Sequence, residues 1–136
     1  MSADRQRINE FVQRFGKDRD LELDPLNEQG YTQIARGSAT VRINVIDEHG
    51  VLLLISPVMP VPERNTEAFY RRLLELSFLA TSDAAFAIDK KTGMAYLRIL
   101  RRLEGLDYDE FEDLLQTIAA VADEWDDKLR AQFGEG

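Results

Sequence analysis

The sequence predicts an α+β fold in which helices pack on one antiparallel sheet. Five strand-length segments, most of them separated by hairpin-type turns, accompany three segments with helical periodicity. The order α-β-β-β-α-β-β-α indicates an antiparallel sheet, because short hairpin turns join antiparallel strands. With 136 residues the chain can build one hydrophobic core, so we expect a single domain over residues 1–136. The predicted elements are a helix over 4–15, strands over 31–35, 39–46 and 51–58, a helix over 65–80, strands over 85–88 and 94–100, and a helix over 108–132.

The first helix is predicted by apolar residues at helical spacing, among them Phe11 and Phe15, and Gly16 is expected to end it as a C-cap. The polar stretch 17–30 is typical of a loop. In the strand over 39–46, Val41 and Ile43 alternate with polar residues, as in a half-buried antiparallel strand.

The strand over 51–58 is apolar on both faces as far as Ser56. One face is expected to meet helices, and the other to meet a partner, a loop or solvent. Pro57, Pro60 and Pro62 are expected to end strand pairing and to hold an extended loop.

The helix over 65–80 has an unusually broad apolar surface. On a helical projection its apolar residues cover roughly 160°, whereas a helix packed on one sheet needs about 100°. Phe69, Leu73 and Leu76 are expected to face the core, and Asn65 is expected to cap the first turn through its side chain. The remaining apolar residues predict a second contact.

The C-terminal helix has the clearest boundary. Asp107 and Glu110 have the spacing of a capping box. A seven-residue apolar repeat then predicts a long amphipathic helix, and it consists of Phe111, Leu115, Ile118, Ala122, Trp125 and Leu129.

The net charge of −8 is concentrated at the C-terminal end, because residues 104–136 contain 11 acidic and 2 basic residues. Such a field disfavours nucleic acid and anionic membranes as partners. Arg98, Arg101 and Arg102 are expected to balance the acidic helix. The chain has no cysteine, no apolar run long enough to span a bilayer and no signal-peptide pattern at its start, so we expect a cytoplasmic protein.

No catalytic constellation is evident. His49 is the single histidine and lies in a turn, no serine stands in a GxSxG or SxxK context, and no phosphate-binding glycine loop is present. Asp123, Asp126 and Asp127 could bind a divalent cation weakly, but a solvated helix face is the favoured interpretation. We therefore expect no enzyme activity, no cofactor and no metal; a metal-dependent hydrolase built on these carboxylates is the least favoured alternative.

Four segments resemble the class I type III secretion chaperones, the Tir-chaperone-like family: VLLLISPVMPVPERNTEAFYRRLLELSF, AFAIDKKTGMAYLRIL, LEGLDYDEFEDLL and ADEWDDKL. The order of elements resembles the family as well. The resemblance implies a homodimeric cytoplasmic chaperone of bacteria that holds an N-terminal segment of a secreted effector in extended, secretion-competent form without ATP. YbjN-type proteins, bacterial regulators of the same fold, are the alternative, and such a protein would bind a folded signalling partner.

The resemblance and the surplus apolar surface together predict two contact sites. The dimer contact is expected at Tyr70, Leu74, Ser77 and Phe78 of the central helix. The client is expected to add as a strand and to fill shallow apolar pockets on the first helix and the first part of the sheet. The client-contact residues predicted are Phe11, Phe15, Val41, Ile43, Leu52 and Leu54.

Overall fold

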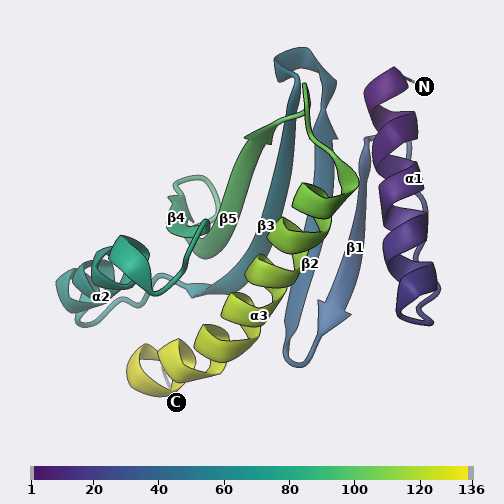
Figure 1. The fold of residues 1–136 in the computed structure, drawn as a ribbon. Coiled ribbons are helices and arrows are strands. Elements are labelled where there is room, and N and C mark those ends of the chain that lie inside the picture. The colour runs from purple at the N-terminus through teal and green to yellow at the C-terminus, as the bar shows by residue number, and fades with distance from the viewer. Residues whose placement is uncertain (1, 135–136) are drawn as a thin grey trace.

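A computed structural model describes residues 2–134 and contains one five-stranded antiparallel sheet and three α-helices (Figure 1). The strand order is β1-β2-β3-β5-β4. This architecture confirms the predicted α+β fold and the predicted order of elements. The elements are α1 (Ala3–Asp18), β1 (Tyr31–Arg36), β2 (Ala39–Ile46), a 3-10 turn η1 (Asp47–His49), β3 (Val51–Pro60), α2 (Thr66–Leu79), β4 (Ala85–Asp89), β5 (Met94–Arg102) and α3 (Tyr108–Phe133).

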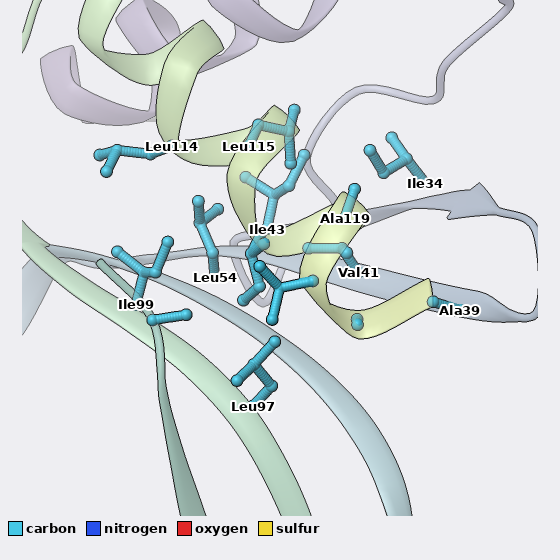
Figure 2. Close-up of a cluster of buried hydrophobic side chains, with 14 of the residues drawn as sticks. Ile34, Ala39, Val41, Ile43, Leu54, Leu97, Ile99, Leu114, Leu115 and Ala119 are labelled. Carbon is cyan, nitrogen blue, oxygen red and sulfur yellow. The ribbon is translucent and has the colours of Figure 1, made fainter. Parts of the chain in front are cut away.

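The long helix α3 lies across one face of the sheet (Figure 1). Helix α1 runs beside β1 at one side, and α2 lies beyond β4 at the other. The seven-residue repeat of α3 faces the sheet as predicted: five of its six residues are buried, and Trp125 is partly buried. Figure 2 shows Leu114, Leu115 and Ala119 of α3 gathered with side chains of the strands below. The core therefore lies between α3 and one face of the sheet.

The capping box at the start of α3 is confirmed on its Asp side, because the Asp107 carboxylate accepts a hydrogen bond of 2.8 Å from the Glu110 backbone N–H. Two other predictions, which concern the ends of helices, are wrong. Asn65 makes no side-chain cap and has a left-handed backbone with φ of 58°. Gly16 lies inside α1, where the chain after the helix folds back: a Cβ on Gly16 would stand 2.7 Å from the Leu21 carbonyl oxygen.

The prolines of β3 do not end strand pairing, which corrects the sequence-based prediction. Pro57 still pairs with Tyr96 and Pro60 with Met94, with a register shift between Pro57 and Met59. The pairing of β3 with β2 extends only as far as Ile55. Beyond that residue β3 has one strand neighbour, so its other side requires no N–H donor and tolerates proline.

Candidate functional site

Helix α2 shows a stripe of exposed apolar side chains. Its buried face consists of Phe69, Leu73 and Leu76. On the other side Tyr70 is 40% exposed, Leu74 is 73% exposed and Phe78 is 84% exposed. These three residues follow one another at intervals of four and so lie along one side of the helix. We call them the α2 stripe; beside its end, Leu79 is also 76% exposed.

Helix α2, which carries the α2 stripe, is anchored to the rest of the chain near each of its ends. The Ser77 hydroxyl donates to the Leu73 carbonyl (2.7 Å) and accepts from the Phe86 backbone N–H of β4 (3.1 Å). The Phe69 ring meets Phe133 of α3 edge-on, with ring centroids 5.2 Å apart. Ser77, predicted as a contact residue, therefore fastens α2 to the edge strand, while the other three predicted contact residues remain available.

The second apolar surface is the face of the sheet that points away from α3. Within residues 2–134 no helix covers it (Figure 1). Along β3 the outward side chains include the half-buried Leu53 and Ile55, and β5 adds Leu100, which is 46% exposed. A groove of about 580 Å³ runs over this surface, lined by residues of all five strands. We call it the open face; its outward residues are Tyr31, Gln33, Ala35, Thr40, Arg42, Asn44, Ile46, Val51, Leu53, Ile55, Pro57, Ala85, Ala87, Asp89, Met94, Tyr96, Arg98, Leu100 and Arg102.

The strand residues predicted to contact a client lie on the opposite face, which is a correction. Val41, Ile43, Leu52 and Leu54 are each 0% exposed and pack in the core beneath α3. In an antiparallel pair the residues opposite one another share a face, so Ile43 paired with Leu54 fixes both inward and turns Leu53 outward. The double-sided apolar pattern of β3 was predicted correctly, but the alternate set that was predicted to contact the client, Leu52 and Leu54, is the buried one.

The two phenylalanines of α1 that were predicted to contact a client also pack into the interior. Phe15 is buried, and Phe11 is partly buried against α3, with its ring 5.7 Å from Tyr108 and 5.5 Å from Phe111 between centroids. Phe11 keeps part of its surface exposed, so of the six predicted client residues it alone offers an accessible side chain.

The carboxylates that the sequence suggested for a weak cation site have structural partners. The Ser38 hydroxyl donates to Asp126 (2.8 Å), and the Ser38 backbone N–H donates to Asp123 (3.1 Å). Arg130 reaches Asp126 at 3.4 Å. These bonds fix the β1–β2 turn against α3, and no group of His, Cys, Asp and Glu within the described residues could hold a metal ion.

A second polar cluster joins α1 to the start of α3. The Arg19 guanidinium lies 2.9 Å from Glu112, and the Tyr108 hydroxyl lies 3.4 Å from both Asp18 and Glu112. Burial raises the pKa of Tyr108 above its ordinary range, and the Glu112 and Asp18 carboxylates raise it further. The cluster joins α1 to α3. His49 is exposed in η1.

No helix among residues 2–134 is long and apolar enough to cross a membrane. Comparison with family models matches residues 6–126 to the Tir chaperone protein (CesT) family. The chain belongs to this family. The match includes both apolar surfaces, and it confirms the resemblance found in the sequence.

Solved structures agree with the family fold. The chain resembles a chain of the ExsC–ExsE complex with a TM-score of 0.74 and 22% identity, covering 95% of this chain and 97% of that one. It resembles a chain of the HopA1–SchA chaperone–effector complex with a TM-score of 0.72 and 15% identity, covering 96% and 98%. YbjN from E. coli matches with a TM-score of 0.53 and 13% identity, covering 86% and 89%. At these identities the likeness shows the fold alone. No curated protein sequence matches the chain.

Sequence reasoning missed the open-face residues, above all Leu53, Ile55 and Arg98. The polar residues Arg42 and Asn44 of β2 indicate which face of that strand points outward. The β3 residues that pair with them, Ile55 and Leu53, lie on the same face. The sequence does not determine the pairing register of β2 and β3 to within one residue. That register decides whether Leu52 or Leu53 faces outward.

Proposed function

We propose that the chain is a dimeric chaperone that holds the N-terminal segment of a secreted effector in an extended, secretion-competent form. The observation that carries the proposal is the presence of two uncovered apolar surfaces on one chain, the α2 stripe and the open face. Family membership supports the chaperone role. The proposal takes the 136 residues as a single domain acting in the cytoplasm, without enzyme chemistry.

The α2 stripe is assigned to the dimer contact. An apolar stripe on a single helix is self-complementary when two copies pack about a twofold axis, because each copy presents the same surface to the other. Tyr70, Leu74 and Phe78 would then leave water together, and Ser77 would hold the helix in place from below.

The open face is assigned to the client. An extended polypeptide can place alternate apolar side chains against Leu53, Ile55 and Leu100 while its backbone remains unfolded. The buried residues Val41, Ile43, Leu52 and Leu54 support this surface from beneath, and the exposed part of Phe11 at α1 is assigned to a second client contact.

Site-specific photo-crosslinking tests the client assignment. A photoreactive phenylalanine analogue replaces Leu100 on the open face in the full chain, the protein is produced in its native cells, and crosslinked polypeptides are identified by mass spectrometry. We expect a secreted protein joined through its N-terminal segment. The matched control places the analogue at Leu21, which is exposed in the loop after α1.

Limited proteolysis of the purified complex then tests the extended form. We expect the N-terminal segment of the client to stay susceptible between its contacts, because it has no fold of its own. A crosslink to a folded domain would favour the YbjN-type alternative, a regulator or adaptor bound to a signalling partner. Failure to crosslink any polypeptide from the open face would refute the client assignment.

A further inference from the structure

The open face carries arginines as well as apolar side chains. In one row across the sheet, Arg42 of β2 pairs with Ile55 of β3, and Ile55 pairs with Arg98 of β5. Adjacent strands lie about 4.8 Å apart, so the two arginines flank Ile55 at a separation of roughly 10 Å between their backbones. Two rows further along, Arg102 pairs with Val51 on the same face. Arginines therefore flank the apolar column of β3 on both sides at Ile55 and on one side at Val51.

These arginines lack carboxylate partners within the described chain. Arg98 and Arg102 take part in none of the ion pairs found among residues 2–134. The Arg42 guanidinium stacks on the Tyr31 ring, with its central carbon 3.4 Å from the ring centroid. Stacking uses the flat surface of a guanidinium and leaves the N–H groups at its edge free to bind a carboxylate.

One acidic residue, Asp89, lies on the open face and lines its groove; most of the others lie elsewhere. Among the outward-facing strand residues the single carboxylate is that of Asp89, at the end of β4, and it accepts a hydrogen bond of 2.9 Å from the Lys91 backbone N–H. The acidic helix α3 lies on the other side of the sheet (Figure 1). Of the three arginines grouped in the sequence, Arg101 alone turns to that side, where it pairs with Asp83 and Glu110. A protein of net charge −8 thus presents a cationic and apolar surface on its open face.

We infer that the open face binds an acidic, apolar polypeptide segment, with apolar side chains on the β3 column and carboxylates on Arg42 and Arg98. The inference rests on the proposed client assignment and names the chemistry of the client segment. Charge complementarity selects the occupant. Arg42 lines the groove and Arg98 stands in the same row across Ile55, so a segment that carries both carboxylates and apolar side chains matches this surface. A nucleic acid backbone would leave the apolar column unused, and binding to an anionic membrane is an outcome that the test below distinguishes.

Peptide display on the immobilised full-length protein tests the inference. A random peptide library is selected on the native sequence, on the variant Arg42→Gln/Arg98→Gln, and on Arg64→Gln as a matched control. Arg64 is exposed in the loop before α2 and lies off the open face. We expect the native protein and the control to enrich peptides that combine Glu or Asp with apolar residues, and the double variant to lose this preference.

The affinity of one enriched peptide is then measured by fluorescence anisotropy, together with its Glu→Gln analogue. Two solvent-accessible ion pairs predict that the double variant binds the acidic peptide about fivefold more weakly. Added salt should weaken peptide binding to the native protein more than peptide binding to the double variant, which keeps Arg102. The Gln analogue should bind the native protein and the variant equally, which a purely structural role of the arginines would not produce.

Three results would overturn the inference. Enrichment of neutral or basic peptides, or enrichment that the double variant retains, would remove the acidic preference while leaving the client assignment intact. Failure to enrich any peptide would remove the peptide site, and the crosslinking experiment would then decide independently whether a client binds. Sedimentation of the protein with vesicles containing phosphatidylserine, abolished in the double variant, would assign the arginines to a membrane surface.

Discussion

Replacement of Phe78 tests the proposed dimer most directly. Phe78 is 84% exposed in the single chain, so its side chain contributes little to the stability of the monomer. Burial of a phenylalanine or leucine side chain contributes about 1.5–3 kcal/mol. In a twofold interface each residue is buried twice, so Phe78→Ala should cost the dimer about 3–6 kcal/mol. Since a factor of ten in the dissociation constant corresponds to about 1.4 kcal/mol, the constant should rise about 100- to 20,000-fold.

Size-exclusion chromatography with light scattering, run over a series of protein concentrations, measures this change. The native chain should have twice its monomer mass of 15.6 kDa, and Phe78→Ala should shift to the monomer mass as the protein is diluted. Leu74→Asp should be monomeric throughout, because it places a charge within the interface. Leu21→Asp is the matched control, since Leu21 is 47% exposed and lies in the loop after α1. It should remain dimeric.

Thermal unfolding of each variant separates loss of the dimer from loss of the fold. Phe78→Ala should keep the far-ultraviolet circular dichroism spectrum of the native chain, because Phe69, Leu73 and Leu76 still anchor α2. A native chain that is monomeric at tens of micromolar would refute the dimer. So would a dissociation constant unchanged by Phe78→Ala, because the contact would then lie elsewhere on the surface.

Three further predictions concern the fold. The Ser56 hydroxyl is buried without a hydrogen-bond partner among the described residues, so Ser56→Ala should raise the free energy of unfolding in urea by about 1 kcal/mol, whereas Ser38→Ala, which loses bonds to α3, should lower it. Gly37→Ala should lower the melting temperature, because Gly37 has φ of 56° and a Cβ there would collide with the Asp123 carboxylate; a melting temperature equal to that of the native chain would contradict this. Burial raises the pKa of the Tyr108 hydroxyl above its unfolded-state value of about 10. The stability that this shift contributes is complete below the unfolded-state pKa and is lost as pH rises through the folded-state pKa. When unfolding is measured over a range of alkaline pH, Tyr108→Phe should therefore lose less unfolding free energy than the native chain.

The sequence predicts the elements of this fold better than it predicts their contacts. The seven-residue apolar repeat of α3 predicts one buried face, because a long amphipathic helix buries its single apolar stripe. The broad arc of α2 is also informative, since the residues left over after the core positions are filled are those found exposed, Tyr70, Leu74 and Phe78. In both helices the local period fixes which side chains share a face.

The strand β3 illustrates what the local pattern leaves open. Apolar residues occupy every position from Val51 to Ile55, so alternation alone assigns no inward set. The decision comes from pairing with β2 and β5, which places Leu52 and Leu54 beneath α3 and turns Leu53 outward. Strand pairing is a long-range property, and a shift of one residue would exchange the two faces. For this reason the prediction chose strand residues that are buried in the core.

The distribution of charge over the surface also depends on long-range strand pairing. The acidic C-terminal segment dominates the net charge and argues against anionic partners when the chain is taken as a whole. In the folded chain that segment lies on the helical side of the sheet, while Arg42 and Arg98, far apart in sequence, are brought into one row on the other side. Exposed charges that are separated by more than a Debye length of about 8 Å interact weakly. The arginines therefore set the local potential of the open face, and a carboxylate-bearing segment can bind to a protein whose net charge is negative.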